Sequence, residues 1–465
     1  MKRQLLALAL GAALVASLAA CGDGGEAPTT AAPGGSASAS ADGAKGQVYY
    51  LNFKPEIADK YAAIAQEYTQ KTGVPVKVVT AAAGTYEQTL RSEIAKSDAP
   101  TIFQINGPVG YQNWKDYTAD LKDSELYKAL SDKSLAISDP GGSVYGIPYV
   151  VEGYGIIYND AIMKAYFALP DKASSLSSAA DIKSFADLKT VAEDMQAKKD
   201  KLGIKGAFAS TSLKKGEDWR WQTHLANIPL YYEWSTNKVD LTKGTPDSIT
   251  FQFAPQYQAI MDLYMSNSTV DKGLLGAKSV SDSMAEFALG QAAMVQNGNW
   301  AWSQVADVKG NKVQEADIKF MPIYIGAPDE AKQGLAIGTE NFFSINSKAK
   351  PEDQKASLDF LYWLYSSPEG KKHVVDDLGF IAPFSTFSAT EVPSDPLGKQ
   401  VKEWSARTDI QNVPWNFSVM PNQTWKDDLG AALLAYSQGK EDWSKVTSDA
   451  VADWATQAAA AKSGQ

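Results

Sequence analysis

The chain has 465 residues, of which 44% are hydrophobic, so it is long enough to build more than one sizeable core. Its formal net charge is −10 at pH 7, and it contains no long run of basic residues. This charge argues against binding to nucleic acid, because phosphate groups require clustered lysine and arginine.

The N-terminal segment has the pattern of an exported, anchored protein. A short basic start, Lys2 and Arg3, precedes an apolar stretch that is too short for a membrane-spanning helix and ends in the letters LAAC. These letters resemble a bacterial lipobox, which implies a lipoprotein signal peptide over 1–20 and acylation of Cys21; a plain secretion signal is the alternative. Residues 21–46 are rich in Gly, Ala, Ser, Pro and Thr, which predicts a flexible linker with a reach of ~25–30 Å. The mature body would then stand on the outer face of the cytoplasmic membrane, and such a tether suits a Gram-positive bacterium.

From residue 47 the pattern alternates between strands and helices. Strands are expected at 47–53, 74–80 and 101–106, because each run is rich in β-branched or aromatic residues. Between them, apolar residues recur at helical spacing. The order β-α-β-α-β predicts parallel strands, and ligands of such sheets meet the loops at the carboxyl ends of the strands. Those loops are 52–56, 82–86 and 106–111.

A long apolar run, VYGIPYVVEGYGIIYN at 144–159, is interrupted by glycines. It predicts either two buried strands or one strand that passes from one lobe into another. Farther along, Pro351 opens a strongly predicted helix, and residues 422–461 predict two amphipathic helices.

The inventory of reactive side chains argues against several kinds of site. The only histidines are His224 and His373, and the only cysteine is Cys21, so neither a zinc site of His or Cys ligands nor a Ser-His-Asp triad is expected. The segment 107–114 lacks the Gly-Lys-Ser/Thr ending of a phosphate-binding loop. No metal or cofactor is therefore predicted. Carboxylates are plentiful, and Glu152, in its apolar setting, would be the first suspect for the acid–base chemistry of a glycoside hydrolase.

The segment GQAAMVQNGNWAW at 290–302 places tryptophans and asparagines just after a predicted strand. Sugars have apolar C–H faces and hydroxyl edges, which flat aromatic rings and amide side chains can match. Trp300, Trp302, Asn297 and Asn299 are therefore candidate sugar contacts. Core packing of the rings and turn formation by the amides are the alternatives.

The same segment resembles the G-x-x-A-M-x-x-N-G-x-W-A-W stretch of maltose-binding-type proteins, the family 1 solute-binding components of carbohydrate ABC importers. YGIPYVVEGYGIIYN resembles that family's crossing between lobes, KTGVPVKV its second strand and APTIFQIN its third. LYSSPEGKKHVVDDLGFIAPF resembles the helix-turn-helix near its returning hinge. The resemblance covers nearly all of the mature chain in order, but it departs at LNFKPEIA and at 217–234.

The resemblance implies an α/β, two-lobed periplasmic-binding-protein-like fold of type II, with discontinuous lobes joined by a hinge. The N-terminal lobe would comprise 47–151 and 343–388, and the C-terminal lobe 152–342 and 389–465. The resemblance also implies a monomeric receptor, not an enzyme, that closes on a carbohydrate in its interlobe cleft and delivers it to ABC importer permease subunits. The many aromatic residues favour an oligosaccharide. The alternatives are a non-sugar solute (a polyol, a glycerophosphodiester or a peptide) and a surface glycoside hydrolase.

Loop positions and resemblance together give the candidate sugar contacts. Trp300 matches the family's stacking aromatic, and Glu152 its contact at the crossing, unless Glu152 makes only a hinge hydrogen bond. The segment EDWRWQTHL offers several side chains, of which Trp221 and His224 are favoured because residues three apart share a face of an α-helix. The full set is Lys54, Glu56, Tyr86, Gln104, Asn106, Glu152, Trp221, His224, Asn297, Asn299, Trp300, Trp302, Glu340, Asn341, Trp415 and Asn416.

Some of these residues have a purely structural alternative. Lys54 and Glu56 could cap a helix that starts at Pro55, and Tyr86 fits the apolar stripe of its own helix. Outside the site, His373 is expected to be solvated, and the tryptophans of the later helices are expected in the core.

Overall fold

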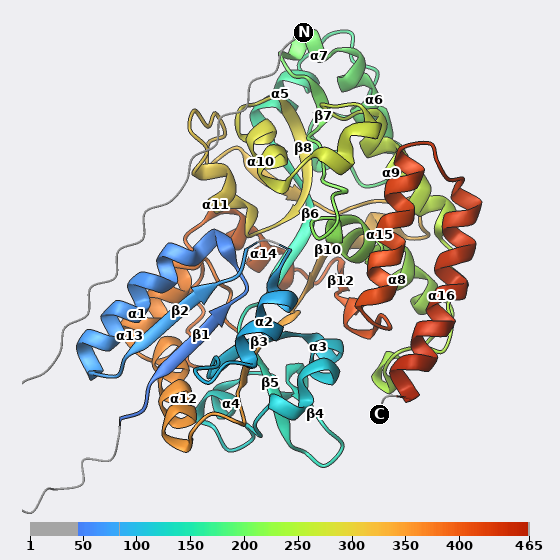
Figure 1. Ribbon diagram of the computed structural model, residues 1–465. Coiled ribbons are helices and arrows are strands. Elements are labelled where there is room, and N and C mark those ends of the chain that lie inside the picture. The colour runs from blue at the N-terminus through green and yellow to red at the C-terminus, as the bar shows by residue number, and fades with distance from the viewer. Residues whose placement is uncertain (1–44, 83, 464–465) are drawn as a thin grey trace, which may run out of the picture. The chain divides into compact units, whose positions relative to one another are not determined.

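The computed structural model describes residues 45–82 and 84–463 (Figure 1). The predicted signal peptide, the lipidation site Cys21 and almost all of the predicted linker lie outside this part of the chain. Within it, no helix is both long and apolar enough to span a lipid bilayer.

The first of two β-sheets is built around the predicted parallel strands. β1 (Val48–Asn52) pairs in parallel with β2 (Val76–Thr80) and with β3 (Ile102–Asn106). The helices α1 (Ala58–Thr72) and α2 (Tyr86–Ile94) make the two connections, which confirms the predicted β-α-β-α-β order. The sheet has the order β2-β1-β3-β11-β5-β4, and its remaining strands pair antiparallel: β4 (Ile137–Ser138), β5 (Val144–Pro148) and β11 (Asn341–Ile345).

The second sheet has the order β12-β10-β6-β8-β7, and β9 also pairs with β6. β6 (Glu152–Asn159) and β8 (Ala292–Gly298) are buried along their whole length. Their long apolar sequences therefore reflect burial on both faces of the sheet. The other strands are β7 (Gly206–Phe208), β9 (Ile318–Met321), β10 (Gln333–Gly338) and β12 (Gln411–Pro414).

The chain passes between the two sheets more than once. β5 ends in the first sheet and Glu152 begins β6 in the second, so the glycine-broken apolar run forms two strands in different sheets. The return path leads from β10 to β11, which starts at Asn341. Asn341 thus pairs in the first sheet, although the predicted boundary placed it in the second lobe. An isolated bridge between Val151 and Ile381 ties the first crossing to a later segment of the chain.

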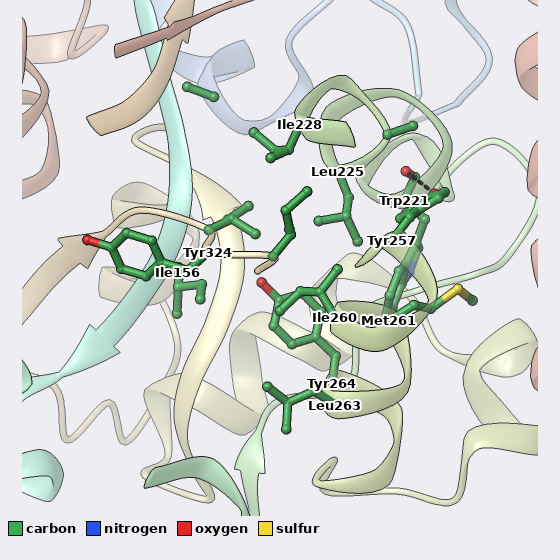
Figure 2. Close-up of a cluster of buried hydrophobic side chains, with 14 of the residues drawn as sticks. Ile156, Trp221, Leu225, Ile228, Tyr257, Ile260, Met261, Leu263, Tyr264 and Tyr324 are labelled. Carbon is green, nitrogen blue, oxygen red and sulfur yellow. Dashed lines mark hydrogen bonds between the residues drawn. The ribbon is translucent and has the colours of Figure 1, made fainter. Parts of the chain in front are cut away.

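Four clusters of buried hydrophobic side chains hold the described sheets and helices together, and the two largest lie against the second and the first sheet. Figure 2 shows part of the core of the second sheet, where Ile156 of β6 lies with side chains such as Leu225 and Tyr264 from the covering helices. In the core of the first sheet, the rings of Tyr50 on β1 and Phe343 on β11 lie 5.8 Å apart, although β3 lies between these two strands in the sheet.

The helices predicted late in the sequence are confirmed as α12 (Pro351–Ser366), α15 (Gln423–Ser437) and α16 (Trp443–Ser463). Trp425 and Trp454 of the last two are fully buried, as expected. The other helices are α3 (Gly107–Trp114), α4 (Glu125–Ala129), α5 (Asp160–Phe167), α6 (Phe185–Ala197), α7 (Lys199–Leu202), α8 (Asn227–Thr236), α9 (Ala254–Ser266), α10 (Val280–Ala288), α11 (Ala301–Ala306), α13 (Pro368–Lys372) and α14 (Pro396–Ala406).

Candidate functional site

The loops after β1, β2 and β3 all touch residues that belong with the second sheet. Lys54, after β1, donates a hydrogen bond from Nζ to Oε1 of Glu152 at 2.7 Å. After β2, a Cβ atom added to Gly84 would lie 2.9 Å from the carbonyl oxygen of Gly216. After β3, the same construction at Gly107 gives 3.6 Å to Cβ of Ser418. The edge predicted to meet ligand is therefore the edge at which the two halves of the fold meet.

Lys54 is the most connected side chain at this meeting point. It is 5% exposed, it lies 3.8 Å from Glu56, and its ammonium is 5.4 Å from the centroid of the Trp300 ring. Burial by itself lowers the pKa of Lys54, but the carboxylates of Glu152 and Glu56 outweigh burial, so the pKa lies above its usual value. The side chain does not cap the helical turn that begins at Pro55. Lys54 is thus a buried cation shared between the two halves.

Five rings from three segments of the chain gather around Trp300, which is half-buried. The Trp300 ring centroid lies 5.8 Å from that of Trp219, 6.0 Å from His224, 6.2 Å from Tyr154 and 6.4 Å from Trp415. Phe417 completes the group through contacts with His224 and Trp415. We call this set the aromatic cluster: Tyr154, Trp219, His224, Trp300, Trp415 and Phe417.

Two glycines hold the tryptophans of the aromatic cluster in place. A Cβ atom at Gly298 would overlap the six-membered ring of Trp300, which follows it closely in the chain. A Cβ atom at Gly338, the last residue of β10, would lie 2.6 Å from Cβ of Trp415. Real Cβ atoms do not approach other carbons this closely, so any other residue at either position would displace an indole.

A π-helix (η5, Arg220–Leu225) determines which residues of the segment 217–234 face the aromatic cluster. Its wider turn shows in the hydrogen bond from the Ala226 amide to the Trp221 carbonyl, five residues back, at 3.0 Å. Trp219 and His224, also five apart, have ring centroids 4.7 Å apart.

The prediction that Trp221 and His224 share a face is wrong, because it assumed α-helical spacing. Trp221 is 1% exposed and points into the core of Figure 2, where its ring meets Tyr264 and its indole nitrogen donates to the carbonyl of Thr211. The neighbouring Arg220 instead lies over the Trp219 ring, with Cζ 4.0 Å from the centroid.

Glu340 reaches the aromatic cluster from the crossing between β10 and β11. Its Oε2 lies 3.5 Å from Nε2 of His224. Burial raises the pKa of Glu340 to about 7, against the opposing charge of Lys426. Burial, with the cations Arg220 and Lys426, holds the pKa of His224 well below its usual value. A neutral histidine thus faces a carboxyl group that titrates near neutrality.

Several buried polar atoms at this place have no hydrogen-bond partner among the described residues. They are both ring nitrogens of His224, Nε1 of Trp415 and Oγ1 of Thr339. Buried polar atoms are normally satisfied, and leaving one unpaired costs about 1–3 kcal/mol. The concentration of such atoms beside aromatic rings is the strongest indication of a ligand site in this part of the chain.

Two other candidate residues, Tyr86 and Gln104, form hydrogen bonds within the part of the fold built on the first sheet. The Tyr86 hydroxyl donates to the Gln104 carbonyl at 3.0 Å and accepts from the Gln104 amide at 2.6 Å. The side chain of Gln104 accepts from the amide of Phe53 and donates to the hydroxyl of Tyr149. Both residues are almost fully buried, so in this structure they shape the loop that carries Lys54.

The asparagines near Trp300 also form hydrogen bonds to other residues of the protein, which favours the turn-forming alternative. Asn299 exchanges two hydrogen bonds with Gly153, through its side-chain oxygen and its backbone amide. Asn297 accepts from Nε of Arg220 at 3.3 Å and is fully buried. Trp302 is half-buried and packs against a separate core cluster.

The remaining candidates lie near Glu340 or hold the loops around it. Asn106 and Asn341 are directly paired between β3 and β11, and the Asn106 amide helps to lower the pKa of Glu340. The backbone amide of Asn416 donates to Oδ1 of Asn227. No group of three or more His, Cys, Asp or Glu residues suited to a metal ion occurs among residues 45–82 and 84–463.

Sequence reasoning missed Tyr154, Phe417 and Lys426, and among the side chains of the segment EDWRWQTHL it favoured Trp221 over Trp219. Lys426 is 5% exposed and follows the core residue Trp425 on α15. A lysine beside a buried tryptophan at the start of an amphipathic helix is the available signal, but such lysines are usually solvated. His373 was expected in solvent, and the structure corrects this: it bridges Glu67 and Asp377.

Comparison with known proteins now identifies the family. Residues 63–408 match the model of a family described as bacterial extracellular solute-binding protein. The chain belongs to this family. No curated protein matches the chain.

Solved structures of solute-binding proteins share the fold. A chitin oligosaccharide binding protein superposes with a TM-score of 0.67 at 17% identity, covering 89% of this chain and 98% of that one. RafE in complex with raffinose gives 0.65 at 18%, covering 89% and 99%. The GacH receptor of Streptomyces glaucescens, solved unliganded and with acarbose, gives 0.65 at 17%, covering 89% and 98%. These likenesses confirm the predicted α/β, two-lobed solute-binding fold and the resemblance to family 1 sugar-binding proteins.

Proposed function

We propose that this solute-binding protein captures a carbohydrate of oligosaccharide size between its two lobes and delivers it to the permease of an ABC importer. The observation that carries the proposal is the aromatic cluster together with the unpartnered polar atoms of His224 and Trp415. Rings cover the apolar faces of pyranoses, and donors and acceptors beside them meet the hydroxyl edges. The structural neighbours that bind chitin oligosaccharides, raffinose and acarbose support this choice of ligand class.

The ligand contacts come from both halves of the fold. From the first we assign Lys54, Glu56 and Asn106, and from the crossings Glu152 and Glu340. From the second we assign the aromatic cluster, with Trp300 as its main stacking platform, and Asn416 at its margin. A sugar that touches both halves stabilises the closed arrangement by its differential affinity for that state. The permease therefore recognises the closed, ligand-bound form of the receptor.

The same proposal covers the organisation of the receptor. The lobes are residues 47–151 with 341–388 and 152–340 with 389–465, because β11 starts at Asn341 and belongs to the first sheet, and the strand crossings between the lobes form the hinge. A lipid on Cys21 and the linker 21–46 hold a monomer on the outer face of the cytoplasmic membrane of a Gram-positive bacterium, beside its permease. The sugar is bound and released intact, because Glu152 is engaged by Lys54 at 2.7 Å rather than free for acid–base chemistry.

Thermal-shift and calorimetric screening against neutral and charged oligosaccharides tests the proposal. A ligand at 100 times its dissociation constant should stabilise the protein by ~2.7 kcal/mol. Trp300→Ala should remove most of this shift. Trp404→Ala is the matched control, because Trp404 is also half-buried but packs on α14 against Arg407.

Three results would contradict the proposal. Stabilisation only by polyols, glycerophosphodiesters or peptides would point to a non-sugar solute. Full retention of binding by the Trp300 variant would place the site elsewhere. Chromatography that shows shortened glycans after incubation would indicate a hydrolase.

A further inference from the structure

Lys426 is a buried cation without an ion pair. It is 5% exposed, and it forms neither a hydrogen bond nor a salt bridge with any residue of the described chain. The side chain lies over the Phe417 ring, and the ring centroid is 6.0 Å from Nζ of Lys426. Glu340 is the carboxylate that affects it most, but the two are not within ion-pair distance. An unpaired buried charge lowers the stability of the folded protein unless an opposite charge or a hydrogen-bonding group pairs with it.

Lys426 lies among other groups that lack partners. Phe417, which it contacts, has its ring 4.7 Å from His224 and 5.1 Å from Trp415. Both nitrogens of His224 and the indole nitrogen of Trp415 are buried without a hydrogen bond to any described residue, although Oε2 of Glu340 lies 3.5 Å from Nε2 of His224. Burial and the positive charges of Arg220 and Lys426 lower the pKa of His224 and keep it neutral.

The side chains of Lys426, Trp415 and His224 together have more hydrogen-bond donors than acceptors. An ammonium supplies three donors, an indole one, and a neutral imidazole one donor and one acceptor. Glu340 is the carboxyl group facing them, and at neutral pH it is partly protonated because burial raises its pKa to about 7. A sugar hydroxyl brings one donor with its two acceptor positions, so each hydroxyl group removes only part of the excess. An ionised carboxylate accepts only, at about four lone-pair positions.

We propose that the ligand of this receptor is an acidic oligosaccharide, and that a uronic acid carboxylate of that ligand pairs with Lys426 and accepts from the indole of Trp415 and the imidazole of His224. This inference rests on the proposed function and adds the substrate class. A single negative charge fits the place better than a phosphate dianion, because Arg220 already donates to Asn297, Lys426 has no hydrogen-bonded partner among the described residues, and the Glu340 carboxyl group lies beside His224. Lys54 is already paired with Glu152.

The experiment compares matched acidic and neutral probes by calorimetry on the full mature chain. Suitable pairs are xylotetraose with and without a glucuronate branch, trigalacturonate and its methyl ester, and cellobiouronic acid and cellobiose. At least one acidic member should bind at least tenfold more tightly than its neutral partner. In Lys426→Met this ratio should fall to about one while the neutral member still binds.

Lys278→Met is the control for net charge. Lys278 is half-buried and is paired with Glu286 at 2.9 Å, so its loss changes the charge of the protein equally without touching the aromatic cluster. It should keep the tenfold ratio. If Lys426→Met does not fold, the ratio for the native chain and its loss in high salt still decide the question.

The outcomes separate the two proposals. Neutral members that bind as tightly as their acidic partners would overturn the acidic specificity and leave carbohydrate binding intact. Binding of no member of any pair, when other neutral glycans do bind, would also overturn the acidic specificity. Failure of every glycan would overturn both.

Discussion

Lys54 donates a 2.7 Å hydrogen bond to Glu152, and this contact joins the loop after β1 to the first residue of β6. Both side chains are buried, at 5% and 3% exposure. A buried pair of this kind contributes little relative to an apolar replacement, but the loss of one partner leaves the other charge without compensation. The pair therefore acts as a fixed link between the two halves of the fold at the place where ligand is expected.

Replacing one member of this pair should cost more than replacing both. Lys54→Met should lower the free energy of unfolding by about 3–5 kcal/mol, because the Glu152 carboxylate remains buried without its partner. The double variant Lys54→Met with Glu152→Gln should recover part of the loss. Guanidinium unfolding of the three proteins measures both effects. A loss of less than about 1 kcal/mol in the single variant would show that solvent already reaches the pair.

Gly298 and Gly338 should be required for sugar binding although neither would touch the sugar. Alanine at either position overlaps the indole of Trp300 or of Trp415, so each variant should weaken glycan binding at least tenfold. Calorimetry measures the affinity. Gly273→Ala is the control, because its added Cβ meets only the flexible carboxylate of Asp271 at 3.2 Å. Unchanged affinity in both site variants would mean that the two rings do not hold the ligand.

Local pattern was sufficient to predict the parallel strands β1, β2 and β3 of the first sheet, because alternating strands and helices leave few arrangements other than parallel strands with crossover helices. The same logic located the three loops that meet the other half of the fold. It could not show that the Tyr86 hydroxyl bonds to the backbone of Gln104, since that depends on how β3 packs against α2. Nor could it show that the Gln104 side chain bonds to Phe53 and Tyr149.

The segment 217–234 was misread for a different reason. A π-helix has no reliable sequence signature, and one extra residue in a turn moves every later side chain to another face. Trp219 was therefore passed over in favour of Trp221. Lys426 was passed over because Glu340, the carboxylate that affects it most, comes from a distant part of the chain, while Phe417 lies in the turn before its own helix.

Substitution of Trp219 should mainly affect glycan binding, whereas substitution of Trp221 should mainly affect the stability of the fold. Trp221→Ala removes a fully buried indole from the core, so it should cost about 3–5 kcal/mol of unfolding free energy. Trp219→Ala should cost less stability but should weaken glycan binding, because Trp219 lies 5.8 Å from Trp300 in the aromatic cluster. Chemical unfolding and calorimetry on both variants provide the comparison. The reverse pattern would mean that the π-helix is not present in solution.

His373 should make the stability of the first sheet depend on pH. It lies between two carboxylates, with Nε2 2.9 Å from Glu67 and Nδ1 2.5 Å from Asp377. Burial lowers the pKa of His373, but the hydrogen bonds to Asp377 and Glu67 outweigh burial, so its pKa is raised above its usual value. The protonated form thus stabilises the folded state. This contribution is fully present below the unfolded-state pKa of ~6.5 and is lost as the pH rises through the higher folded-state value.

Measurement of the free energy of unfolding from about pH 6 to about pH 9, a range that spans the expected titration of His373, tests this prediction. The native chain should lose stability as the pH rises through this window, and His373→Gln should remove that part of the slope. The histidine also helps to lower the pKa of Glu67, which adds stability that is lost as the pH falls through that lowered pKa, so the same variant should lose less stability in acid than the native chain. An identical pH profile for the native chain and the variant would show that the imidazole carries no proton between the two carboxylates.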